Sequence, residues 1–253
     1  MLETSTVLLN KMLASLPAGV QRRLLPYMEL ELLPLGKVLC EAGDTMRNVY
    51  FPANAIVSLL YVMENGASAE ISVIGSEGLI GIALFMGGGS TPNQALVRSA
   101  GYAYRLQGQK FKDECNRHSE LMMILLRYTQ ALFTQMSQIA VCNRHHTIVQ
   151  QLCRLLLLSL DRLTGNHLAM TQELIANMLG VRREGVTEAA GKLQKLGIIE
   201  YSRGRITVLD RSELESHCCE CYGVVKTETN RLLPYLSQYT AAGLRAGGSR
   251  SAY

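Results

Sequence analysis

The sequence predicts an α+β fold in three parts: an N-terminal antiparallel β-roll, a long helix, and a C-terminal winged helix-turn-helix domain. Residues 30–106 form short apolar stretches separated by Gly, Asn, Pro and Asp, which is the spacing of a β-sandwich or barrel. Residues 119–143 repeat apolar or small side chains at alternating steps of four and three, which is typical of a long packed helix. Residues 171–208 combine two short amphipathic helices with two strand-like runs.

The composition is that of a folded protein. Of the 253 residues, 48% are apolar and 18% are charged, which allows one large or two modest domains and excludes wholesale disorder. The net charge of +4 is too small to identify a partner. The apolar runs at 79–89 and 155–158 are far shorter than the ~20 residues that span a membrane, and residues 1–16 lack the pattern of a signal peptide. We therefore expect a cytoplasmic protein with no membrane contact.

We assign residues 1–118 to N-terminal helices and the β-roll. Residues 5–28 should form two short helices, because their apolar periodicity is interrupted near Pro17 and Gly19. The strands that follow should be antiparallel, because turn-forming sequences separate them. These turn sequences lie at residues 34–36, 42–44, 64–66 and 87–89.

Residues 119–143 are predicted to be a dimerisation helix. Their repeat is that of a coiled-coil interface, and a polar side chain at Gln135 could set the register. The alternative is that the same helix packs against its own domain. The predicted interface residues are Leu121, Leu125, Tyr128, Leu132, Gln135, Ile139 and Cys142.

Residues 144–240 are assigned to a winged helix-turn-helix domain with a C-terminal helix, and residues 241–253 to a disordered tail. A first helix should run from about His145 to Leu163. Thr171 can cap the next helix, and Gly180 supplies the turn before a further helix that opens at Arg182 or Arg183.

The outward face of that last helix suits nucleic acid. It offers guanidinium, carboxylate and hydroxyl groups near its N-terminus, where a recognition helix meets base edges. The two strand-like runs at 198–208 meet at an Arg-Gly-Arg turn, which would lie along the phosphate backbone as a wing. The predicted DNA-contacting residues are Thr171, Arg182, Arg183, Glu184, Thr187, Glu188, Lys192, Arg203 and Arg205.

A roll, a long helix and a winged helix in this order resemble the Crp/Fnr family of bacterial transcription regulators over about residues 10–210, and residues 171–196 are the strongest motif. The resemblance implies a cyclic-nucleotide-binding-like jelly roll that acts as the sensor domain, a homodimer, and recognition helices that read a pseudo-palindromic site in double-stranded DNA. It also implies RNA polymerase and a small-molecule effector as further partners. The Arg183-Glu184 pair lies where the family commonly places base-reading residues.

The part of the roll that resembles a nucleotide cassette departs from the family pattern. Residues 78–84 resemble its start, but Ile82 stands where the family has a ribose-binding glutamate, and Asn93-Gln94 where it has the phosphate-binding Arg-Ser pair. The loss of these contacts should cost several kcal/mol of binding, so we expect no cyclic AMP binding of the usual kind. Arg98 and Arg105 could substitute, although exposed strand positions are favoured for both.

The cysteines do not predict a cofactor, and we leave any cofactor unassigned. The oxygen-sensing branch of the family holds an iron-sulfur cluster on N-terminal cysteines, whereas only Cys40 lies within residues 1–110 here. His217, Cys218, Cys219 and Cys221 could converge as metal or redox ligands. Buried thiols that pack a helix are the favoured interpretation, so no metal site is predicted, and His145 and His146 are interpreted as hinge or surface residues.

No catalytic motif is present in the sequence, and residues 30–108 contain no histidine for a roll-based metalloenzyme. The sequence therefore predicts a homodimeric, sequence-specific DNA-binding regulator and not an enzyme, with no catalytic residues. The alternative is a ligand-binding or protein-interaction module whose winged helix contacts a protein partner.

Overall fold

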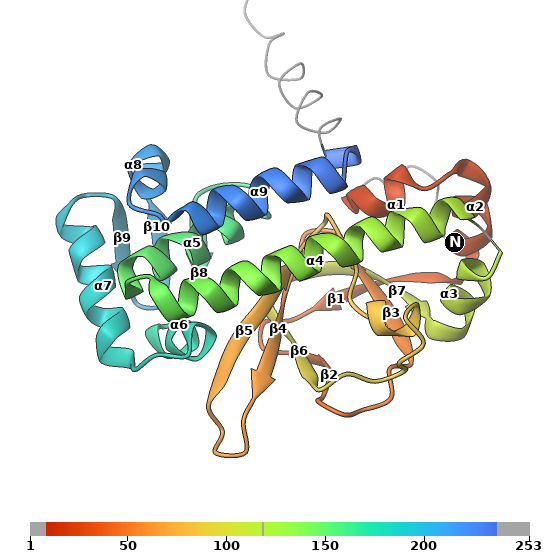
Figure 1. Cartoon of the computed structure of the whole chain (residues 1–253), viewed down its shortest axis with the longest axis horizontal. Coiled ribbons are helices and arrows are strands. Elements are labelled where there is room, and N and C mark those ends of the chain that lie inside the picture. Colours follow the sequence, from red (N-terminus) through yellow and green to blue (C-terminus); the bar gives the residue numbers. More distant parts are fainter. Residues whose placement is uncertain (1–8, 118, 237–253) are drawn as a thin grey trace, which may run out of the picture.

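The computed structural model describes residues 9–117 and 119–236, and its three parts follow one another along the chain (Figure 1). Two antiparallel sheets form the predicted N-terminal roll. One has the order β1-β7-β3, with β1 Met28–Leu33, β7 Gly101–Gln107 and β3 Asn48–Pro52. The other has the order β2-β6-β4-β5, with β2 Val38–Cys40, β6 Asn93–Ser99, β4 Ile56–Val62 and β5 Ser68–Ile74.

Short helices close the ends of the roll. The two helices predicted before it are present as α1 (Lys11–Ser15) and α2 (Ala18–Leu24). The chain breaks between them at Pro17, which is the N-cap of α2. Three further short helices flank the strands: η2 Leu25–Tyr27, η3 Ile82–Leu84 and α3 Gly108–Cys115.

The long helix α4 (Ser119–His145) runs across the roll and on to the C-terminal domain (Figure 1). Its inward face is held by polar contacts as well as by apolar packing. The Gln135 amide accepts a hydrogen bond from Val73 N (3.2 Å) and donates one to Val73 O (3.3 Å). The Tyr128 hydroxyl donates to Leu79 O at 2.8 Å. The helix is therefore part of the roll's own core.

This packing corrects the predicted dimer interface. All seven predicted residues lie on the inward face of α4, where each is at most 5% exposed, so they cannot meet a second chain and the assignment was wrong. The apolar repeat identifies the face that is buried, but it does not show whether the same chain or another one covers it. The residues are Leu121, Leu125, Tyr128, Leu132, Gln135, Ile139 and Cys142.

The C-terminal domain contains the predicted helices and a small antiparallel sheet of order β8-β10-β9. The helix predicted over about 145–163 is shorter, because Thr147 and Gln150 form a capping box that starts it anew after α4. Strand β8 was not predicted. The elements are α5 Ile148–Leu160, β8 His167–Ala169, α6 Gln172–Leu179, α7 Arg183–Lys195, β9 Ile199–Ser202, β10 Arg205–Val208, α8 Arg211–Ser216 and α9 Glu220–Leu232.

Two hydrophobic cores share the β4–β5 region of the roll. Val57 and Leu59 of β4 point into the roll core, whereas Ile56 and Leu60 belong to the core of the C-terminal domain. A sheet covered on both faces explains why β4 begins as a continuous buried run without polar alternation. The C-terminal domain is thus packed directly onto the outer face of the roll.

Helix α9 connects the same two cores from the other side. It starts in the C-terminal domain, with Val225 in that core, and runs back beside α4 (Figure 1). At its end Leu232 and Leu233 enter the roll core. The hydroxyl of Tyr235, just beyond it, donates to Glu77 O at 2.8 Å. The predicted C-terminal helix therefore belongs to both domains.

None of the helices described by the structure combines the length and the apolar character needed to cross a membrane. The tail predicted to be disordered, residues 241–253, lies outside the described residues.

Candidate nucleic-acid interface

Local capping interactions set the angle between α6 and α7. The Thr171 hydroxyl accepts a hydrogen bond from Leu174 N at 3.1 Å and caps α6, as predicted. Gly180 ends that helix with φ +66°, a left-handed conformation that favours glycine. Val186 of α7 is completely buried, in the same core as Ile175 and Leu179 of α6. These contacts leave the opposite face of α7 free.

The outward face of α7 carries the predicted polar side chains. Arg182, the N-cap residue, makes no side-chain cap, and Arg183 and Glu184 follow it in the first turn, all exposed. The hydroxyl of Thr187 donates to Gln172 Oε1 at 2.9 Å, which connects α7 to the start of α6. Glu188, next to Thr187, forms an exposed ion pair of 2.9 Å with Lys192, which lies one turn further along the helix. Water and salt screen an exposed pair of this kind, so it contributes little to stability, and Lys192 can exchange this partner for another anion.

The wing is a tight hairpin between β9 and β10. Ser202 pairs with Arg205, and the two residues between them have left-handed backbones, with φ +48° at Arg203 and +76° at Gly204. Two successive left-handed residues form the turn that matches the twist of paired strands. The guanidinium groups of Arg203 and Arg205 consequently project from the surface.

A surface hollow of about 480 Å³ lies between α6, α7 and the wing. Arg183 and Arg203 reach it from two elements, and Gln172 and Tyr201 add an amide and a phenol that the sequence argument did not include. Burial raises the pKa of Tyr201, and the charge of Arg183 opposes that rise. The only sequence signal for Gln172 is its place directly after the cap. The lining residues are Thr171, Gln172, Glu173, Arg183, Tyr201, Arg203 and Gly204.

All nine residues predicted to contact DNA are exposed, and they lie at the start of α6, along α7 and on the wing. These elements pack against one another at one end of the molecule (Figure 1). The surface they form has a hollow between α6, α7 and the wing, and it carries four exposed arginines. Such a surface can contact base edges and phosphates at once.

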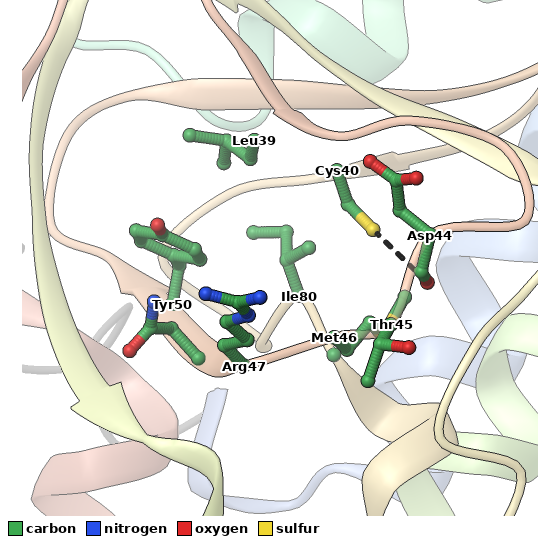
Figure 2. A pocket seen from close by; sticks show the side chains of 10 residues that line it. Leu39, Cys40, Asp44, Thr45, Met46, Arg47, Tyr50 and Ile80 are labelled. Atoms are coloured by element: carbon green, nitrogen blue, oxygen red, sulfur yellow. Dashed lines mark hydrogen bonds between the residues drawn. The ribbon is translucent and has the colours of Figure 1, made fainter.

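The roll contains a separate hollow of about 460 Å³ between β2, β3 and the segment at Ile80 and Gly81 (Figure 2). Arg47 and Tyr50 line it, and Cys40 and Asp44 lie across from them. Gly81 has φ +105°, and a β-carbon there would lie 3.2 Å from Asn48 O, so this cassette-like position needs glycine.

The substituted cassette positions carry no cationic side chain. Ile82 packs against the roll core. Gln94 donates from Nε2 to Glu41 Oε2 at 2.8 Å, so an acidic group lies beside the position where the resemblance implies a phosphate-binding residue.

Neither arginine that could replace the missing cation faces this hollow as a free group. Arg105 pairs with Glu29 and Glu31 and is partly exposed. Arg98 is only 1% exposed, which corrects its prediction as an exposed strand residue. It lies instead between the domains, with Nη1 at 2.7 Å from Glu70 Oε2 and Nη2 at 2.7 Å from Ser159 Oγ of α5. Burial lowers the pKa of Arg98, and the Glu70 carboxylate opposes this.

Comparison with known proteins agrees with this arrangement. Residues 30–118 match the cyclic nucleotide-binding domain family, and residues 150–217 match the Crp-like helix-turn-helix domain family. No curated protein sequence matches the chain.

Solved structures share the fold. A protein from Eubacterium rectale described as a regulator of the Crp/Fnr family is 15% identical, with a TM-score of 0.65 over 81% of this chain and 95% of that one. FixK2 from Bradyrhizobium japonicum is 14% identical, with a TM-score of 0.64 over 76% and 98% of the two chains. The c-di-GMP-responsive regulator CLP from Xanthomonas campestris is 14% identical, with a TM-score of 0.61 over 77% and 100%.

The order of the two matched domains along the chain, the long helix between them and the exposed recognition helix of the second domain lead to one conclusion: this protein is a transcription regulator of the Crp/Fnr family.

Proposed function

We propose that this regulator binds a specific, pseudo-palindromic DNA site as a homodimer. The observation that carries the proposal is the exposed first turn of α7 beside an arginine-bearing wing. In this proposal Arg182, Arg183, Glu184 and Thr187 lie near base edges in the major groove. Thr171, Glu188, Lys192, Arg203 and Arg205 border them, and Lys192 and the two wing arginines neutralise phosphates. RNA polymerase is the further partner that we propose for a regulator bound at a promoter.

The outward face of α4 supports the homodimer. It carries an apolar stripe, here called the outer stripe, which the described part of the chain leaves exposed or partly exposed. Its steps of four and three are those of a coiled-coil interface. Phe133 at its centre is 57% exposed. The outer stripe consists of Met122, Leu126, Thr129, Phe133, Met136 and Ala140.

A second copy suits this stripe better than a smaller partner does. The stripe runs along a helix of 27 residues, and an isologous pair would bury the same residues on both chains. If the two α4 helices pack in parallel, the two α7 helices lie at the same end of the dimer. Half-sites one helical turn apart, about 34 Å or 10 base pairs, fit such a dimer.

DNA selection from a random duplex library, followed by affinity measurements over a salt series, tests the proposal. We expect an inverted repeat and a steep salt dependence. Arg183→Ala should cost about 1–3 kcal/mol on the selected site and relax its base preference. Arg205→Ala should weaken selected and scrambled DNA alike and reduce the salt slope by about one.

Arg22→Ala is the matched control, because Arg22 is an exposed arginine of α2 in the N-terminal domain. It should leave affinity and salt slope unchanged. Equal losses on selected and scrambled DNA for Arg183→Ala would contradict the assignment of Arg183 to base reading. The alternative, a winged helix that contacts a protein, predicts no selected sequence and binding that is insensitive to these arginines.

A further inference from the structure

Four potential metal ligands converge where α4 ends and α9 begins. Cys142 lies in the last turn of α4 and His146 directly after it, whereas Cys219 is the N-cap of α9 and Cys221 lies in its first turn. The Sγ atoms of Cys142 and Cys219 are 3.5 Å apart, as are Cys221 Sγ and His146 Nδ1. All four ligand atoms lie within 4.8 Å of one another.

These separations fit a single tetrahedral ion. Zinc–sulfur bonds of about 2.3 Å and zinc–nitrogen bonds of about 2.0–2.1 Å imply distances of about 3.8 Å between two sulfur ligands and about 3.6 Å between sulfur and nitrogen. The observed distances are close to both values. A disulfide would need an S–S distance of about 2.05 Å and would leave His146 and Cys221 unexplained. An iron-sulfur cluster would need room for several iron and sulfide atoms between the ligands.

Groups around the four ligands suit a metal site. The other ring nitrogen of His146, Nε2, lies 3.4 Å from Glu220 Oε2, which is the carboxylate–histidine arrangement that orients a metal-binding imidazole. The amide of Gln151 donates to His146 O at 2.9 Å and so holds the backbone of this connection in place.

A buried cation also points to an anionic centre here. Arg154 of α5 is 2% exposed, and its Nε donates to Cys142 Sγ at 3.2 Å. Within residues 9–117 and 119–236 no ion pair joins Arg154 to a carboxylate, and its other partner is the Asn143 amide oxygen, which is neutral. Buried charges are normally paired. Three thiolates and one divalent ion would carry a net charge of −1 and would provide that pairing.

We propose that Cys142, His146, Cys219 and Cys221 bind one Zn²⁺ ion in a closed, four-coordinate site. With all four positions taken by protein ligands, the ion is structural and not catalytic. It joins the end of α4 to the start of α9 across the connection between α4 and α5. Of the four residues that the sequence offered as possible metal ligands, Cys219 and Cys221 belong to this site. His217 bonds to Glu213 O, and the Cys218 thiol points to Gln150 O.

The test is the metal content of the full-length protein, purified under reducing conditions and measured by elemental mass spectrometry. We expect about one zinc per chain. After exchange with Co²⁺, the visible spectrum should be that of tetrahedral cobalt with thiolate ligands. Removal of the ion with a chelator should lower the melting temperature, and added Zn²⁺ should restore it.

Variants identify the ligands. Cys142→Ser, Cys221→Ser and His146→Ala should each reduce zinc retention at least about tenfold. His146→Cys should retain the ion, because four thiolates also form a structural zinc site. Cys218→Ser is the matched control, since Cys218 lies next to the ligands in sequence but outside the site, and it should retain the full zinc content.

Three results would overturn the proposal: iron and sulfide in place of zinc, a Cys142–Cys219 disulfide with no bound metal, or an undiminished zinc content in Cys142→Ser. If the ligand variants do not fold, the stoichiometry and the cobalt spectrum of the unmodified chain decide the question. None of these measurements depends on DNA binding, so they stand apart from the proposed function.

Discussion

Arg98 shows how a single charged residue joins the two domains. It lies on β6 of the roll, yet its guanidinium contacts Glu70 of β5 and Ser159 of α5, and Nη1 lies 3.9 Å from Met178 Sδ of α6. Glu70 also bonds to the hydroxyl of Ser58. The network therefore links the roll to α5 and α6 of the C-terminal domain. Because it is buried, its geometry is tightly specified.

Removal of one partner from this buried pair should be costly. We expect Arg98→Met to lower the free energy of unfolding by about 3–5 kcal/mol, because it leaves the Glu70 carboxylate buried without its cation. Urea denaturation followed by circular dichroism measures the change. Arg98→Met combined with Glu70→Met should recover much of the loss.

Arg105→Met is the matched control at the surface of the same roll. Arg105 pairs with Glu29 and Glu31 but is partly exposed, so its loss should cost at most about 1 kcal/mol. A cost for Arg98→Met no larger than this would show that the interdomain pair does not contribute to stability.

At the scale of elements, α4 has two apolar faces with different roles. The inward face, with Tyr128 and Gln135, is bonded to the roll. The outer stripe, with Phe133 at its centre, remains for a second chain under the proposed dimer. Apolar residues on both faces are expected of a helix that packs between the roll of its own chain and a second chain.

A charge in the outer stripe should disrupt the dimer without disrupting the fold. We expect the unmodified protein to show twice the mass of one chain by light scattering at micromolar concentration, and Phe133→Glu to show the mass of one chain. The reason is that two carboxylates would meet in an apolar interface.

Thr134→Glu adds the same charge one residue further on, about 100° around the helix and away from the centre of the stripe. It should remain dimeric. If both variants keep the mass of the unmodified protein, α4 does not form the interface through this face.

At the scale of the whole molecule, the C-terminal domain is held to the roll from two directions. The β4–β5 region is covered on both faces, and α9 carries apolar residues from the C-terminal core into the roll core. A change in the roll could therefore reach α6 and α7 through packed elements, without the need for a flexible link. These packed elements provide a continuous route through which an effector bound in the roll would change DNA binding.

Cyclic AMP should not be that effector. We expect no binding heat in titration calorimetry of the full chain with cyclic AMP and no change in DNA affinity when it is added. Ile82 cannot accept bonds from ribose hydroxyls, and Gln94 is bonded to the Glu41 carboxylate. Saturable binding with a change in DNA affinity would contradict this proposal. The hollow beside Arg47 and Tyr50 would then be the first place to locate the nucleotide.

Local patterns in the sequence by themselves determined much of this protein. Turn residues and short apolar runs predicted the roll, the Thr171 cap and Gly180 predicted the helix-turn-helix, and the Arg-Gly pair at 203–204 predicted the wing. These features depend on interactions between residues close in the chain, which a sequence records directly. The spacing of the apolar residues in α7 also predicted that its opposite face is exposed.

Only the tertiary structure decided which partner each face meets. In the folded chain the inward face of α4 packs on the roll and Arg98 is buried between the two domains. The fold also brings Cys142 and His146 close to Cys219 and Cys221. Each of these depends on contacts between residues about 30 to 80 positions apart. A hydrophobic period shows that a face is buried but does not show which partner covers it. The cysteines at 217–221 are too few to define a metal site until the fold brings Cys142 and His146 beside them.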